Sequence, residues 1–147
     1  MRVRDQITVP KLLRLFDYWN VKRGNRRLPS RADIDPTEMG FILGNVDLVE
    51  VSYDPVVFTF RLSGSIIDQN EGFNMQGRTL DEYPLSEYRD AIRRSYLEAL
   101  NSGEPHYEVL NRVADGKLHR YARLILPLST DGIRIDMLLM GRVELKT

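Results

Sequence analysis

The sequence predicts an α+β domain, a five-stranded antiparallel sheet with helices covering one face and one further helix at the N-terminus. Three observations predict this class. Five segments have the alternation or the β-branched and aromatic content of strands, and short turns join several of them. A helical block separates the first two strands from the last three. The 147 residues suit one domain with a sizeable core.

The N-terminal part predicts a helix and a connector. Residues 10–22 carry apolar side chains at helical spacing, begin with Pro10, which suits a first turn, and stop before Gly24. A short second helix is expected after Asp35, because this residue caps free N–H groups and Pro36 follows it. We assign residues 1–44 to the N-terminal helix and connector, and residues 45–147 to the core of the same structural domain.

Two groups of strands are expected, one on each side of the helical block. The first hairpin spans 45–53 and 56–63, where Phe58, Phe60 and Leu62 alternate with polar residues. The last three strands are expected over 105–114, 117–128 and 133–143, with Asp-Gly turns between them.

The helical block between the two groups of strands is expected to cover one face of the sheet. It contains a short helix and loop over 64–77, a helical turn over 79–83 and the clearest amphipathic helix over 84–101. An antiparallel sheet has to bury its apolar face, and this block is the natural cover. A pocket between the block and the sheet follows easily from this arrangement.

Composition excludes several classes of function. The 21 Lys and Arg balance the 21 Asp and Glu, which argues against broad nucleic-acid binding, and the basic run over 23–31 is expected to be a solvated connector. No cysteine is present, so disulfides and thiol chemistry are excluded. No secretory signal and no long apolar run is found, and we expect a cytoplasmic protein without membrane contact.

Four ordered motifs carry a family resemblance. They read FDYWNVKRGNRRLPSRADIDP over 16–36, FTFRLSG over 58–64, GRTLDE over 77–82 and PLSTDG over 127–132. Together they resemble a family of small stand-alone bacterial PAS proteins found mainly in alphaproteobacteria, over about residues 12–143. The resemblance implies a PAS fold and a signalling or regulatory role without family-wide catalysis, and it names no ligand.

The resemblance also limits the cofactor. Photoactive flavin adducts and thioester-linked chromophores of PAS domains need a cysteine, which this chain lacks. Haem-binding members offer a histidine from the helical block, whereas His106 and His119 fall in expected strands, so haem is disfavoured. A non-covalent flavin, a small organic ligand or no ligand at all remains compatible with the sequence.

Candidate ligand-binding residues are those expected to face the pocket, with plain hydrophobic core as the alternative for each apolar one. They are Phe60, Leu62, Ile66, Tyr88, Ile92, Tyr96, Arg123 and Met137. Arg123, or Arg61, is the expected clamp for an acidic ligand, because a guanidinium fork matches a carboxylate. The alternative for both arginines is a solvent-facing strand position.

The N-terminal helix is the candidate partner surface, through Leu12, Leu15, Phe16 and Trp19. The alternative is that Trp19 anchors the helix to the sheet. Arg31 is expected to bind a carboxylate such as Asp33 or Asp35.

The expected function is a single-domain sensor or adaptor. Because no output module is recognised in the sequence, the partner is expected to bind in trans, for example a histidine kinase, and a homodimer is compatible with this function.

Two alternatives stay open. One is an enzyme resembling ketosteroid isomerase, with Asp68, Asp81 or Tyr83 as the acid or base. The other is a ligandless scaffold that only docks proteins. Metal binding is not expected, because His106 with Glu108 and His119 with Asp115 lack the spacing of zinc ligands.

Overall fold

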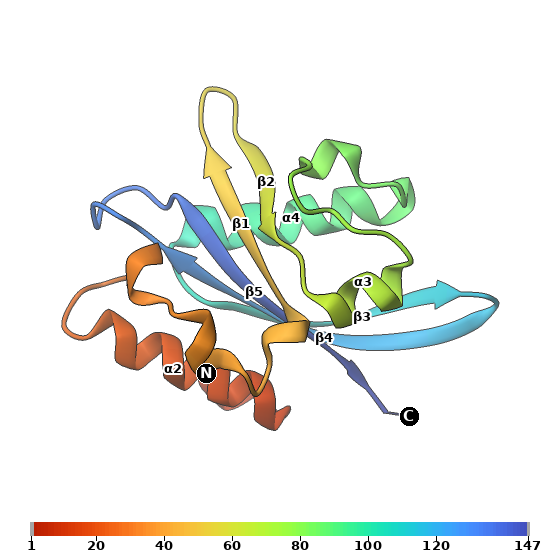
Figure 1. The fold of residues 1–147 in the computed structure, drawn as a ribbon, viewed down its shortest axis with the longest axis horizontal. Coiled ribbons are helices and arrows are strands. Elements are labelled where there is room, and N and C mark those ends of the chain that lie inside the picture. Colours follow the sequence, from red (N-terminus) through yellow and green to blue (C-terminus); the bar gives the residue numbers. More distant parts are fainter. Residues whose placement is uncertain (1, 147) are drawn as a thin grey trace.

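The structure, a computed structural model, describes residues 2–146 and contains one five-stranded antiparallel sheet. The strand order across the sheet is β2-β1-β5-β4-β3 (Figure 1). The strands are β1 (Val46–Ser52), β2 (Val57–Leu62), β3 (His106–Ala114), β4 (Lys117–Leu128) and β5 (Met137–Leu145). The predicted fold class is therefore confirmed.

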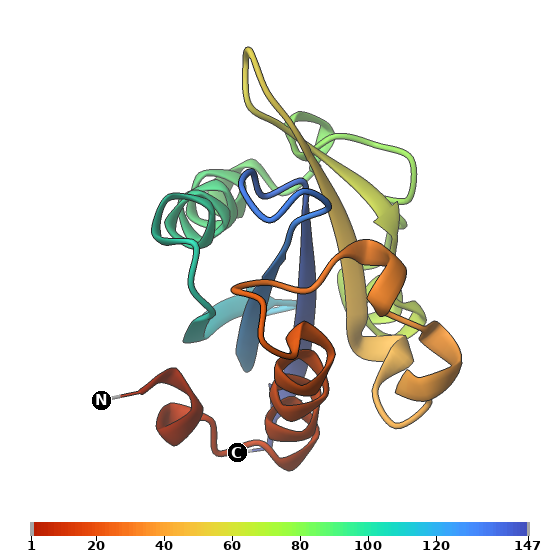
Figure 2. The same cartoon turned by 90° about the vertical axis from the view of Figure 1, so that its left-hand side faces the viewer.

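Helices lie on both faces of this sheet. They are α1 (Val3–Gln6), α2 (Pro10–Arg23), α3 (Ser65–Glu71) and α4 (Ser86–Ser102), with 3-10 turns η1 (Arg31–Asp33), η2 (Pro36–Met39), η3 (Leu43–Asn45) and η4 (Leu80–Glu82). Figures 1 and 2 show the strands between α2 and α4. We call the face toward α3 and α4 the inner face and the face toward α2 the outer face. The prediction had helices on one face and one further helix at the N-terminus, and the structure places this N-terminal helix, α2, on the other face.

Helix α2 packs directly onto the outer face. Leu12 and Leu15 lie so close to Gly141 of β5 that a Cβ there would come within 2.8 Å of each leucine. Trp19 is also buried, and its Nε1 donates a hydrogen bond to the Pro127 carbonyl at 2.9 Å. The anchoring role of Trp19 is therefore confirmed.

The expected partner surface on α2 is corrected by this packing. Leu12, Leu15 and Trp19 are in the core of the chain itself, because the apolar stripe of the helix covers the outer face of the sheet. Phe16 is only partly buried and keeps some exposure.

Strand β5 starts four residues later than predicted. The Asp131 carboxylate accepts hydrogen bonds from the backbone N–H groups of Ile133 and Arg134, and the Ser129 hydroxyl lies 2.6 Å from the Arg134 carbonyl. These local bonds hold a loop in place of a ladder, and Ile133 is 84% exposed. Alternation of apolar residues alone did not distinguish this loop from a strand.

The connector confirms one local prediction and corrects another. The Asp35 carboxylate accepts the Thr37 backbone N–H at 3.0 Å and caps η2, as expected. Arg31 donates to the Ile34 carbonyl at 2.8 Å and not to a carboxylate. The Asp33 carboxylate is instead paired with Arg26 at 2.8 Å.

Candidate functional site

A small chamber lies between the inner face of the sheet and helices α3 and α4. Its cavity is about 30 Å³, close to the volume of one water molecule in the liquid. Apolar side chains form part of its wall, namely Phe60, Ile67, Phe73, Met75, Ile92, Tyr96 and Met140. The rest of the wall is polar and contains Asp47, Ser63, Asp68, Glu71, Tyr83, Arg112, Arg123 and Arg142.

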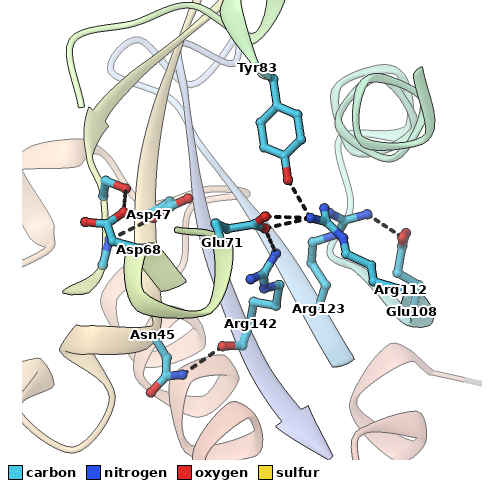
Figure 3. Close-up of polar contacts among 11 residues, drawn as sticks. Asn45, Asp47, Asp68, Glu71, Tyr83, Glu108, Arg112, Arg123 and Arg142 are labelled. Atoms are coloured by element: carbon cyan, nitrogen blue, oxygen red, sulfur yellow. Dashed lines mark hydrogen bonds and ion pairs between the residues drawn. The ribbon is translucent and has the colours of Figure 1, made fainter. Parts of the chain in front are cut away.

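Three arginines form a stripe across neighbouring strands on the inner face (Figure 3). Arg112 comes from β3, Arg123 from β4 and Arg142 from β5, and Arg123 lies directly opposite Arg142 in the strand register. Their exposed fractions are 5%, 2% and 4%. Cations this deeply buried are costly unless carboxylates neutralise them. We call these residues the arginine stripe.

Glu71, the last residue of α3, supplies one carboxylate to the stripe. Its oxygens accept Arg112 Nη1 at 2.7 and 2.9 Å, and one of them also pairs with Arg142 (Figure 3). The Glu71 side chain is 7% exposed, so both ion pairs are buried. Removing one member of such a pair typically costs about 3–5 kcal/mol in stability, since the other charge stays buried. Glu71 therefore couples the end of α3 to β3 and β5.

Glu108 of β3 supplies the second carboxylate. It accepts Arg123 Nη2 at 2.7 Å and His106 Nε2 at 2.6 Å, and the Ser95 hydroxyl of α4 lies 2.7 Å away. Burial by itself would raise the pKa of Glu108, but the bond from His106 and the charge of Arg123 outweigh it and lower the pKa to about 2. Glu108 is therefore ionised at neutral pH and couples α4 to the sheet.

Aromatic rings fix the orientation of two of the three arginines. The Arg112 guanidinium lies 4.7 Å from the centroid of the Tyr88 ring and donates to the Tyr83 hydroxyl. The Arg142 guanidinium lies 4.4 Å from the Tyr121 ring centroid. Stacking on aromatic faces holds a guanidinium plane in place independently of its carboxylate partner.

Each arginine of the stripe also has an unused donor. Within residues 2–146, the Nε atoms of Arg112, Arg123 and Arg142 are buried and have no hydrogen-bond partner. A buried N–H group without a partner costs about 1–3 kcal/mol. The stripe therefore has donor capacity beyond what Glu71 and Glu108 use.

Asp47 of β1 is the third acidic group of the chamber and has a different environment. It is 4% exposed, and its carboxylate accepts the Gly64 backbone N–H at 2.9 Å. Burial raises its pKa to about 7, although the Gly64 bond and the charge of Arg142 act in the opposite direction. Asp47 is therefore a buried carboxyl that changes its charge near neutral pH.

The chamber brings together half of the predicted ligand-binding residues. Phe60, Ile92, Tyr96 and Arg123 line it, and their role in ligand binding stays a prediction. Arg61 does not reach it, because Arg61 pairs with Glu50 on the exposed surface at 3.0 Å.

The other four predicted residues lie outside the cavity wall. Ile66 is 41% exposed, and the Tyr88 ring stacks on Arg112 while its hydroxyl accepts the Val113 N–H. Leu62 follows a register shift in the β1–β2 pairing, and Met137 lies opposite Glu50 at the start of β5. Period-2 counting placed Leu62 and Met137 at the cavity. The register shift pairs Leu62 with Leu48, and in β5 Met140 and Arg142 face the chamber, so Met137 lies on the side of Gly141, toward α2.

Sequence reasoning missed five polar residues of the chamber, Asp47, Ser63, Glu71, Arg112 and Arg142. A signal existed for Arg142, a single charge following the apolar run of β5. Glu71 gave none, since it lies near the end of a short polar segment that reads as solvent-exposed.

Of the three residues named for the enzymatic alternative, Asp68 and Tyr83 line the chamber. The Asp68 carboxylate is bonded to Ser63 and Asn74, and the Tyr83 hydroxyl accepts from Arg112. Asp81 lies on the surface and pairs with Arg93.

Across residues 2–146, no group of three or more His, Cys, Asp or Glu is arranged to hold a metal ion. None of the described helices is long and apolar enough to cross a bilayer.

Comparisons with known proteins agree with this architecture. A family model described as PAS domain matches residues 7–139. A sensory box sensor histidine kinase from Vibrio cholerae has 18% identity and a TM-score of 0.54, covering 76% of this chain and 90% of that one. The Rhodobacter sphaeroides LOV protein has 16% identity and a TM-score of 0.52 over 68% of this chain, and the match spans 58% of that protein's length. No curated protein sequence matches the chain.

Proposed function

Because the chain belongs to the PAS domain family, we propose that it is a non-catalytic sensor that relays a signal by binding. The family match covers residues 7–139 and therefore includes both the sheet and the chamber. The binding event we propose is entry of a small molecule into the chamber, which changes how α3 and α4 contact the sheet. A signalling protein then reads that change.

The polar chamber is the observation that carries this proposal. A sheet that only has to bury its inner face can do so with apolar side chains, but this one buries three arginines and Glu71 there, with the partly buried Glu108 beside them. Buried ion pairs are frequently no more stabilising than apolar side chains of the same volume, so they are weak devices for stability. They do link α3 and α4 to three strands through contacts that a polar ligand is able to replace.

The content of the chamber argues against the enzymatic alternative. Its size does not distinguish a ligand from a substrate, because a cavity of about 30 Å³ admits either one only when α3 or α4 moves. Glu71 and Glu108 are both held in ion pairs, which leaves them poor general bases.

The proposed partner is a signalling protein bound in trans, such as a histidine kinase. The Vibrio cholerae structure of the same fold is described as a sensor histidine kinase. At 18% identity this likeness concerns the fold, and the partner is proposed from the sensor class.

The methionines allow a direct test of ligand entry. Met75 and Met140 line the chamber, while Met39 is buried outside its wall. In protein labelled with ¹³C at the methionine methyl groups, a pooled library of small metabolites is expected to shift the Met75 and Met140 resonances and to leave Met39 unchanged. If no compound moves Met75 or Met140, the small-molecule part of the proposal fails and the protein-docking scaffold becomes the better interpretation.

A further inference from the structure

The arginine stripe has more positive charge than its two glutamates neutralise. Three guanidinium groups, all at most 5% exposed, face Glu71 and Glu108. Glu108 is committed to Arg123, so Arg112 and Arg142 share the single carboxylate of Glu71. Asp47 and Asp68 also line the chamber, but among the described residues their carboxylates are hydrogen-bonded to Gly64, and to Ser63 and Asn74, and not to the stripe. Three Nε donors of the stripe are unused. Unused donors on guanidinium groups that share one carboxylate favour an anion with several acceptor oxygens.

Glu71 also differs from Glu108 in how it reaches the stripe. Glu108 lies on β3, a neighbour of the strand that carries Arg123, and is fixed by the sheet itself. Glu71 comes from the end of the short helix α3 and is followed directly by Gly72, whose φ of 86° is a conformation that glycine adopts readily. The Glu71 carboxylate can therefore leave the stripe by a local change that does not disturb the sheet.

Arg112 and Arg142 also have contacts that do not depend on Glu71. The Tyr88 ring supports Arg112, and the Tyr121 ring supports Arg142. A pre-oriented guanidinium pair loses little conformational entropy when it binds a new carboxylate. Because Glu71 lines the cavity, its departure also adds the space of a carboxylate group to the existing cavity.

From these contacts we propose that the arginine stripe is a binding site for a small carboxylate, and that Glu71 occupies the carboxylate position as an internal competitor when no ligand is present. This inference rests on the proposed sensor function and names its ligand class and its switch. The ligand carboxylate takes the Nη donors of Arg112 and Arg142 and meets the unused Nε groups. Glu71 is displaced, and the end of α3 loses its ion pairs with β3 and β5.

The test compares wild-type protein with Glu71→Gln, using acetate and malonate as probes. The substituted glutamine side chain is neutral and competes weakly for the arginines, whereas the Glu71 carboxylate has to leave before a probe binds. If Glu71 occupies the stripe for more than about 90% of the time, its removal strengthens apparent affinity at least about tenfold. Binding is followed by the ¹³C methyl resonances of Met75 and Met140 at constant ionic strength with chloride as the balancing anion.

Matched controls separate this effect from general electrostatics. Glu50→Gln removes an exposed glutamate that also pairs with an arginine, and is expected to bind malonate no better than wild type. Acetamide and malonamide have the shape of the probes without the charge and are expected to leave the methyl resonances unchanged. Adding Arg142→Met to the Glu71→Gln protein is expected to abolish binding.

A destabilised Glu71→Gln protein remains informative. Its thermal midpoint is expected to rise with malonate by more than that of wild type, because the probe replaces the missing carboxylate. Glu71→Asp keeps the charge on a shorter side chain and is expected to fall between wild type and Glu71→Gln in malonate affinity.

Three results would overturn the inference. They are equal malonate affinity in wild type and Glu71→Gln, an equal gain in Glu50→Gln, and equal binding of malonamide. If the metabolite library reveals a neutral ligand at Met75 and Met140 while Glu71→Gln ignores carboxylates, the carboxylate inference is wrong and the sensor function stands.

Discussion

Replacing Asp47 by asparagine is expected to remove a specific pH dependence of stability. The Asp47 carboxylate is buried in the chamber, and its main hydrogen bond is accepted from the Gly64 N–H at 2.9 Å. The oxygen of an asparagine amide accepts the same bond and does not titrate. The substitution therefore removes the titration while keeping the shape and the main contact of the side chain.

The magnitude follows from the pKa of Asp47, which burial raises from 3.8 to about 7. Between these two values the folded protein holds a proton that the unfolded chain has released. The stabilisation is therefore fully present below about pH 4, is lost as pH rises through 7, and stays constant above that. The full difference corresponds to roughly 4 kcal/mol at about 1.4 kcal/mol per pKa unit.

The assay is urea unfolding from about pH 4.5 to about pH 8.5, a range that brackets the raised pKa. Unfolding is followed by the fluorescence of Trp19, the only tryptophan of the chain. The free energy of unfolding of Asp47→Asn minus that of wild type is expected to increase by several kcal/mol across this range. Glu50→Gln is the control. Arg61 lowers the pKa of the exposed Glu50, so the corresponding difference should change little over the same range.

A difference between Asp47→Asn and wild type that stays constant with pH would refute this reasoning. Asp47 would then be ionised throughout, with an ordinary pKa, and the chamber would be better hydrated than its burial indicates. A ¹³C NMR titration of the Asp47 carboxyl group, with an inflection near its ordinary value of 3.8 in place of one near 7, would lead to the same conclusion.

Three further substitutions test contacts around the chamber and the outer face. Gly64→Ala is expected to cost more than about 2 kcal/mol in urea unfolding, because its Cβ would overlap the Gly44 carbonyl oxygen; an unchanged midpoint would show that this approach is looser. Trp19→Phe is expected to lower the free energy of unfolding by about 1–3 kcal/mol in thermal unfolding, because it leaves the buried Pro127 carbonyl of β4 without its donor. An unchanged stability would mean that a water molecule replaces the indole N–H as donor. Arg123→Met is expected to raise the pKa of Glu108 above its value of about 2, because the neighbouring positive charge is lost while the burial remains. The pKa is measured by ¹³C NMR. A pKa still near 2 would mean that other hydrogen-bond donors, and not Arg123, lower the pKa of Glu108.

Much of the fold could be predicted from the sequence because its signals are local. The apolar stripe of α2 and the alternation around Phe60 follow from helical and strand periodicity. The cap at Asp35 follows from one side chain and the two residues after it. The lack of cysteine excluded thiol-linked chromophores without any structural information.

The same local signals failed where one sequence pattern is compatible with two different local structures or environments. The loop before β5 alternates like a strand, but side-chain bonds from Asp131 hold it away from the ladder. The stripe of α2 reads equally well as a partner surface or as core. Only the position of Gly141 beneath Leu12 and Leu15 decided between them.

The candidate site was determined almost entirely by the tertiary structure. Arg123 was predicted from its own strand, but Glu71 reaches Arg112 across 41 positions and Arg142 across 71 positions of the chain. Periodicity gives the face on which a strand side chain lies, and it carries no information on the register of that strand with its neighbours or on where a short helix ends above the sheet. These two non-local quantities bring Arg112 and Arg142 together on Glu71 and place Arg123 beside them with Glu108, and so turn an apolar-looking pocket into a charged one.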